Sequence, residues 1–192
     1  MNRIIKRRIA WGAFAAALAI TGCQTVETTR GGAVGVDRKQ QMSVLTPSPQ
    51  QVDQAARQQY AQVLGEANKK GALNKDARQT ERVRAIAQRL IPHTAVFRDD
   101  APRWNWEVNV LVSDQVNAWC MPGGKIAVYT GLIEKLNITD EELAAVMGHE
   151  IAHALREHAR ERMGRAQAAG LGAAVAEIGI EMVDFRQMVY VQ

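Results

Sequence analysis

The most informative stretch of the sequence is TDEELAAVMGHEIAHAL, which runs from Thr139 to Leu155. Its first four residues have the pattern of a capping box, in which the side chains of Thr139 and Glu142 each accept a hydrogen bond from the other residue's backbone N–H. Two further acidic residues in the first turn favour the positive end of a helix. The stretch therefore predicts a helix that begins directly after Thr139.

The predicted helix has two faces of different character. At about 100° per residue, its apolar residues form one stripe. That stripe consists of Leu143, Met147, Ile151, Ala154 and Leu155. His149 and His153 fall on another face, one turn apart, so that both imidazoles can reach a single ion at about 2.0 to 2.1 Å.

His149, Glu150 and His153 form the H-E-x-x-H motif, whose chemistry is that of zinc. Zinc accepts three protein ligands and keeps an open position for water, from which Glu150 can take a proton. We therefore predict one Zn²⁺ per chain, with His149 and His153 as metal ligands and Glu150 as the catalytic residue. The alternative is that both histidines are ordinary surface residues of an alanine-rich helix.

The residues after the motif favour structural roles. His158 lies five positions after His153 and rotates back toward the apolar stripe, which indicates a hydrogen-bonded core or boundary histidine and not a ligand. Arginines interleaved with Glu157 and Glu161 indicate a solvated helix face with compensating charges. These arginines are Arg156, Arg160, Arg162 and Arg165.

The net charge of the chain comes from its first residues. The 192 residues include 24 Lys+Arg and 20 Asp+Glu, a formal charge of +4. Residues 1–22 hold 4 of the basic and none of the acidic residues, so the rest of the chain is neutral. This balance gives no support for nucleic-acid binding. A composition of 47% hydrophobic and 23% charged residues is typical of one globular domain with its own core.

The first residues also have the layout of an export signal. A cationic stretch precedes about 12 mostly apolar residues, Ile9 to Ile20, too few to cross about 30 Å of hydrocarbon as a helix. Ile20-Thr21-Gly22-Cys23 resembles the bacterial lipobox, which implies that Cys23 is lipidated. A plain signal peptide with a nearby cysteine is the alternative.

The resemblance to a lipobox also implies where in the cell the protein is located. Gln24 after Cys23 resembles lipoproteins sorted to the outer membrane, so we expect a periplasmic protein that is lipid-anchored to the inner leaflet of that membrane. With Cys23 acylated, Cys120 has no disulfide partner in the chain. We interpret Cys120 as a small packed residue, with a reactive thiol as the alternative.

Breakers and periodicities divide the chain into three segments. They are a lipoprotein signal peptide over 1–22, a lipid-anchored tether over 23–50 and a folded domain over 51–192. The tether lacks a helical or strand period, although its apolar residues would allow part of it to pack on the domain.

Within and just before the domain, the patterns predict helices, strands and a turn. The helices are expected over 50–68 and 76–90, the strands over 104–110, 116–121 and 125–130, and the turn at Pro122-Gly123-Gly124. Period-two alternation assigns one set of side chains to the core face of the first strand. That set is Trp104, Trp106, Val108, Val110 and Val112.

Two motifs together carry a family resemblance. The segment NAWCMPGGKIAVYTGL, Asn117 to Leu132, followed by the H-E-x-x-H helix, resembles the zinc metallopeptidases related to the CAAX prenyl protease and HtpX, and more narrowly their periplasmic lipoprotein branch. The resemblance covers about residues 31–180. It implies a mainly helical α+β fold, a zincin-like metallopeptidase domain with a small β-sheet or hairpin beside the H-E-x-x-H helix.

The same resemblance implies an activity and a substrate site. It implies a zinc metalloendopeptidase that hydrolyses misfolded or unfolded cell-envelope proteins in quality control. An extended substrate would add as a strand along the sheet edge through backbone hydrogen bonds. The residues implied to line this cleft are Asn117, Ala118, Pro122, Gly123 and Gly124.

The sequence departs from that family at the third zinc ligand. The family takes this ligand from a Glu in an E-x-x-x-D element on a later helix, and residues 154–192 contain no such element. Glu177 and Glu181 are the candidates within the chain, but we expect the ligand beyond Gln192, with the domain C-terminally incomplete. The alternative function is an inert truncated copy, or a chaperone-like lipoprotein that binds unfolded chains.

Overall fold

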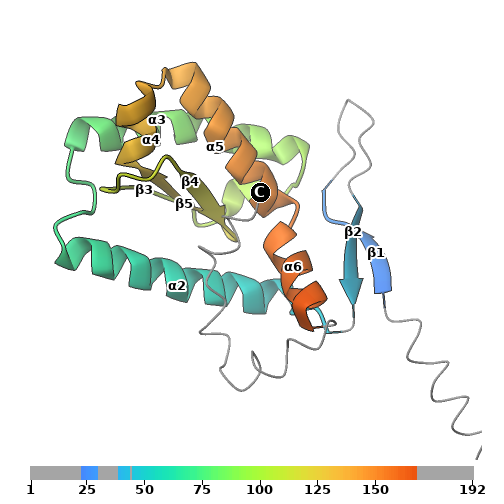
Figure 1. The fold of residues 1–192 in the computed structure, drawn as a ribbon. Coiled ribbons are helices and arrows are strands. Elements are labelled where there is room, and N and C mark those ends of the chain that lie inside the picture. The colour runs from blue at the N-terminus through green and yellow to red at the C-terminus, as the bar shows by residue number, and fades with distance from the viewer. Residues whose placement is uncertain (1–22, 30–38, 44, 168–192) are drawn as a thin grey trace, which may run out of the picture.

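The computed structural model describes residues 23–29, 39–43 and 45–167 (Figure 1). The predicted signal peptide and the candidate ligands Glu177 and Glu181 lie outside these residues. The described elements are β1 (Cys23–Glu27), β2 (Lys39–Ser43), α2 (Pro49–Lys69), α3 (Ala77–Leu90), β3 (Glu107–Leu111), β4 (Ala118–Met121), β5 (Lys125–Tyr129), α4 (Thr130–Leu136), α5 (Asp140–Leu155) and α6 (His158–Ala166). Two 3-10 helices, η1 (Ile91–Val96) and η2 (Ala101–Arg103), connect α3 to β3. The mainly helical α+β class is confirmed.

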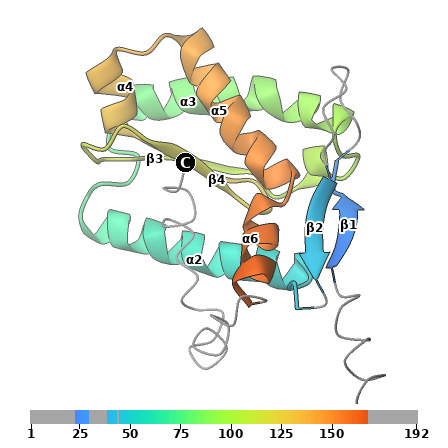
Figure 2. The same ribbon diagram turned by 45° about the vertical axis from the view of Figure 1, so that its right-hand side comes forward.

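A three-stranded sheet lies at the centre of the domain. Its strand order is β3-β5-β4, with β5 parallel to β3 and antiparallel to β4. Helix α2 covers one face, and α3 and α5 cover the other (Figure 2). Each face buries its own apolar cluster, so the strands are covered on both sides and form the middle layer of the core.

The strand β3 is shorter than the alternation predicted. Trp104 and Trp106 precede it and stack on each other with ring centroids 5.5 Å apart, while still packing against the core. Val112 is 45% exposed because the strand ends at Leu111, so its placement on the core face was wrong. Asn109, expected on a polar face, is buried under α2 and donates to the Tyr60 hydroxyl at 2.9 Å.

Helix α5 begins where its capping pattern predicted, and α2 and α3 begin within one residue of their predicted starts. In α5, the Glu142 amide donates to the Thr139 hydroxyl at 3.3 Å, and the Thr139 amide donates to the Glu142 carboxylate at 2.9 Å. Ser48 and Gln51 form a second capping box at the start of α2. Among the described residues, no helix is both long and apolar enough to cross a membrane.

The interval predicted as a tether contains regular structure. Strands β1 and β2 pair antiparallel, with Cys23 opposite Ser43, although their short, polar sequences show no strand period. Met42 is buried, β2 packs against α6, and the Thr28 hydroxyl donates to the Arg156 carbonyl at 3.0 Å. The described part of this interval therefore packs on the domain, as its apolar residues allowed.

Candidate metal centre

The helix α5 holds the H-E-x-x-H motif in place through its apolar stripe. All five residues predicted for that stripe are buried against the sheet and α3. His149 lies on the exposed side of the helix, and His153 and Glu150 are half-buried. The cap at Thr139 sets where the helix begins, and the buried stripe sets its rotation about its own axis. Together they determine the positions of His149, Glu150 and His153.

The two histidines converge through one nitrogen each. The Nε2 atoms of His149 and His153 are 2.9 Å apart, and the rings meet edge to face with centroids 4.5 Å apart. Two nitrogens bound to one tetrahedral zinc at about 2.0 to 2.1 Å are separated by about 3.3 Å. A small rotation of either ring reaches that spacing, so the pair fits zinc.

Glu150 follows His149 on α5 and its side chain is half-buried. Burial raises the pKa of its carboxyl from 4.5 to about 7, because the charged form loses solvent. A carboxyl with this pKa exchanges protons readily near neutral pH, as a general acid or base must. Cys120, close to Glu150, is a free thiol in the core, and burial also raises its pKa. The interpretation of Cys120 as a small packed residue is therefore confirmed.

His158 contacts the site from the start of α6. Its Nδ1 atom lies 2.5 Å from Nδ1 of His153, and it is half-buried, so the prediction of a hydrogen-bonded boundary histidine is confirmed. Burial lowers the pKa of His158 to about 4, so the ring is neutral at physiological pH. Its partner could not be inferred from helical periodicity, because α5 ends before His158 is reached.

The charged face predicted to be solvated is in fact partly buried. One carboxylate oxygen of Glu157 forms an ion pair with Arg98 at 2.7 Å, and the other forms one with Arg160 at 2.8 Å. The side chains of all three residues are only 15 to 20% exposed. Only Arg165, at 64% exposed and paired with Glu161, fits the prediction well. The strands β1 and β2 and residue Arg98 approach this face from distant parts of the sequence, so i,i+4 spacing alone could not predict its burial.

The predicted substrate residues lie at different places along the β4–β5 hairpin. Pro122 and Gly123 line a cavity of about 250 Å³ that also reaches Ala154 of α5, and neither His149 nor His153 lines it. Gly124 packs against Trp106, where a Cβ atom would lie 2.6 Å from the indole ring. Ala118 is buried and Asn117 is half-buried at the start of β4.

The strand β4 is at the edge of the sheet next to α5. It pairs with β5 on one side, and on the other side with no strand among the described residues. Within residues 23–29, 39–43 and 45–167, no three His, Cys, Asp or Glu side chains are arranged so that they could hold a metal ion together, and no third ligand joins His149 and His153 there. The described site is therefore a two-histidine, one-carboxylate centre beside a sheet edge.

Comparison with known proteins identifies the family. Residues 77–190, more than half of the chain, match the model of Peptidase family M48. The chain belongs to this family. The match contains the sheet, the capped helix and the H-E-x-x-H motif. The narrower assignment to the periplasmic lipoprotein branch stays a prediction.

Three relatives illustrate the extent of the similarity. The chain is 47% identical over 57 residues to the mitochondrial metalloendopeptidase OMA1 of Arabidopsis thaliana, covering 30% of this chain and 12% of that protein. It is 39% identical over 92 residues to the mitochondrial metalloendopeptidase OMA1 of Bos taurus, covering 46% and 16%. It is 39% identical over 54 residues to the metalloprotease YcaL of Escherichia coli, covering 28% and 20%. The chain thus spans a fifth or less of the length of these relatives.

Proposed function

We propose that this chain is the catalytic part of a zinc-dependent metalloendopeptidase. The observation that carries the proposal is the 2.9 Å approach of the Nε2 atoms of His149 and His153, with Glu150 on the same helix. Membership of Peptidase family M48 and similarity to proteins named metalloendopeptidase and metalloprotease support it.

The residues of α5 divide the chemistry between them. His149 and His153 would hold the ion, which when bound supplies a polarised water and polarises the peptide carbonyl. Glu150 would accept a proton from that water and return it to the departing amine nitrogen, so that the same carboxyl acts first as base and then as acid. In the zinc-free chain, burial raises the pKa of this carboxyl to about 7.

The substrate is proposed to bind as an extended chain along β4. Asn117 directly precedes this strand, Ala118 begins it, and the Pro122–Gly124 turn follows it, while the H-E-x-x-H helix packs against it. Pairing with the backbone of an edge strand recognises extended polypeptide with little regard to sequence. This mode favours unfolded or misfolded chains as substrates and cleavage within a chain.

The location is proposed from the lipobox-like segment that ends at Cys23. Acylation of Cys23 would anchor the protein to the inner leaflet of the bacterial outer membrane, where misfolded envelope proteins are available for quality control. Replacing Cys23 with Ser is expected to release the protein from the membrane fraction. Unchanged fractionation of this variant would exclude the lipid anchor.

Zinc content and casein cleavage test the proposed activity together. We expect about one zinc per chain and zinc-dependent cleavage that is lost in Glu150→Gln, which keeps the shape of the side chain but cannot take up the proton. Glu141→Gln, an exposed glutamate on the same helix, is the control and should leave cleavage unchanged. Zinc well below one per chain, with equal cleavage by the wild type and Glu150→Gln, would favour an inert or chaperone-like protein.

A further inference from the structure

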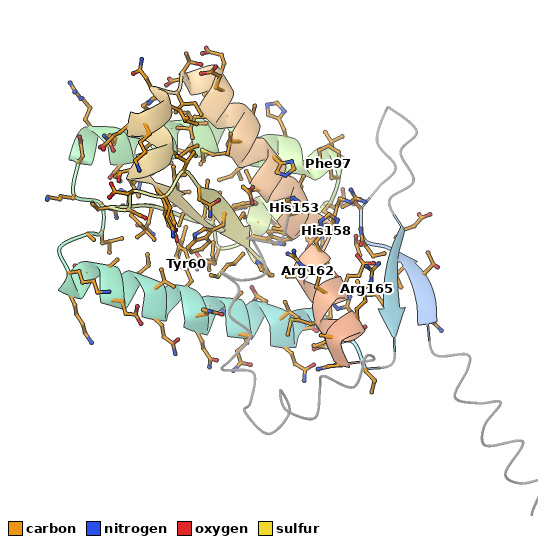
Figure 3. All side chains as sticks on the ribbon, viewed as in Figure 1. Tyr60, Phe97, His153, His158, Arg162 and Arg165 are labelled. Carbon is orange, nitrogen blue, oxygen red and sulfur yellow. The ribbon has the colours of Figure 1, made fainter. Side chains whose placement is uncertain are left out.

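His153 contacts a second histidine on the side away from His149. Its Nδ1 atom is 2.5 Å from Nδ1 of His158, and the two ring centroids are 4.7 Å apart with their planes at 62° (Figure 3). Its Nε2 atom is 2.9 Å from Nε2 of His149. The two nitrogens of His153 therefore have two different partners.

These contacts constrain where the proton of His153 can lie. A neutral imidazole carries one N–H and one lone pair, so a ring that offers Nε2 to a metal must carry its proton on Nδ1. That proton needs an acceptor, and Nδ1 of His158 is at hydrogen-bonding distance. His158 accepts it only when its own proton is on Nε2.

The backbone between the two helices brings His158 to this position. In an uninterrupted helix, a residue five positions after His153 would be rotated from it by about 140° and would point elsewhere. Instead, α5 ends at Leu155, and Glu157 takes a left-handed conformation with φ 56° before α6 begins. The ion pairs of Glu157 with Arg98 and Arg160 tie this corner to the segment after η1 and to α6.

We propose that His158 is a positioning residue for the zinc ligand His153. It accepts a hydrogen bond from Nδ1–H of His153. This bond selects the tautomer of His153 with a lone pair on Nε2, and it orients the ring so that Nε2 of His153 and Nε2 of His149 point toward the same ion. Partners of this kind commonly change metal affinity 10- to 100-fold. The inference rests on the proposed zinc site and adds a residue that does not itself bind the ion.

The tautomers of the wild-type protein test the proposal without a mutation. The chain has only four histidines, so long-range ¹H–¹⁵N spectra of the imidazoles can be assigned by single replacements. In zinc-free protein at a pH where the rings are neutral, we expect the proton of His153 on Nδ1 and that of His158 on Nε2. The reverse arrangement, with His158 donating, would overturn the proposal whether or not the protein binds zinc.

Zinc affinity of three variants provides the second test. His158→Phe removes the acceptor and should weaken zinc binding roughly 10- to 100-fold. His158→Asn places an amide oxygen near the position of Nδ1 and should restore most of the affinity. His93→Phe, which removes an exposed imidazole elsewhere, should change nothing. Equal affinity of His158→Phe and the wild type, or equal weakening in His158→Phe and His158→Asn with both folded, would overturn the proposal.

The two experiments separate this inference from the proposed function. Absence of zinc binding in the wild type would refute the metallopeptidase, while the tautomer of His153 would still show whether His158 accepts its Nδ1 proton. Zinc binding and casein cleavage that are both insensitive to His158→Phe would leave the metallopeptidase intact and refute the positioning role.

Discussion

Glu157 and Arg98 form an ion pair of 2.7 Å that joins the corner between α5 and α6 to the segment after η1. The second carboxylate oxygen of Glu157 binds Arg160 at 2.8 Å, and Arg160 also donates to the Pro47 carbonyl. Through these contacts, one side chain connects the end of the H-E-x-x-H helix, the chain before α2 and the loop that follows α3. The corner that presents His158 to His153 therefore depends on long-range contacts.

Replacement of Glu157 by Ala is expected to destabilise the protein by about 1 to 3 kcal/mol, because two partly buried arginines each lose one of their partners. Urea denaturation measures the effect. Arg57→Ala, which removes an exposed ion pair with Asp53, is the control and should cost less than about 1 kcal/mol. Equal small losses in the two variants would show that the Glu157 pairs contribute no more than surface ones.

The cap of α5 gives a second prediction. Thr139→Ala removes the acceptor for the Glu142 amide and should lower the free energy of unfolding by about 1 kcal/mol, whereas Thr139→Ser keeps the hydroxyl and should lose little. The difference between Ala and Ser isolates the hydrogen bond from other effects of the substitution. Identical stabilities of the two variants would contradict the cap.

The buried carboxyl of Glu150 makes the stability of the zinc-free protein depend on pH. Its pKa is about 7 in the folded state and near 4.5 when unfolded, so the folded state holds the proton more tightly. Raising the pH through this window therefore favours unfolding. Glu150→Gln should match the wild type near pH 4 and exceed its stability by about 1 to 2 kcal/mol at pH 8, a value reduced for partial exposure.

Chemical denaturation of the zinc-free wild type and Glu150→Gln at several pH values measures this difference. Glu141→Gln should show no comparable gain at high pH, because its side chain is exposed. A constant difference between the wild type and Glu150→Gln from pH 4 to pH 8 would mean that the folded-state pKa of Glu150 is not raised.

The turn between β4 and β5 gives a prediction about packing. Gly124 has φ 81°, and a Cβ atom there would lie 2.6 Å from the Trp106 ring, so Gly124→Ala should cost about 2 to 4 kcal/mol. Gly65 in α2 has open space around it, and Gly65→Ala should instead stabilise the protein by about 0.5 to 1 kcal/mol. Thermal unfolding of both variants tests whether Gly124→Ala lowers the stability of the protein and Gly65→Ala raises it.

Local patterns in the sequence predicted much of this architecture correctly. The capping residues, the apolar stripe of α5 and the Pro122–Gly124 turn act over a few positions, and each is found in the structure. The exposure of Val112 and the burial of Asn109 were not predicted. They depend on where the strand ends and on α2, which lies far away in the sequence and covers the second face of the sheet.

In the candidate site, too, local sequence predicted some features, while others depend on residues that are distant in the sequence. The spacing of His149 and His153 was enough to predict that they converge, because one helical turn determines it. The contact of His158 with His153 required a left-handed residue at Glu157, and nothing in the local sequence specifies that conformation. The pairing of β1 with β2 was missed because both strands are short and polar, and because β2 packs against α6, which lies far away in the sequence.

The central claim is that His149 and His153 bind the same zinc ion through Nε2. X-ray absorption at the zinc edge of the purified, zinc-loaded chain counts its imidazole ligands directly. We predict two imidazoles at about 2.0 to 2.1 Å in the wild type and one in His149→Ala, with His93→Ala unchanged from the wild type. A zinc environment without imidazole in the wild type, or one unaltered by His149→Ala, would contradict the account.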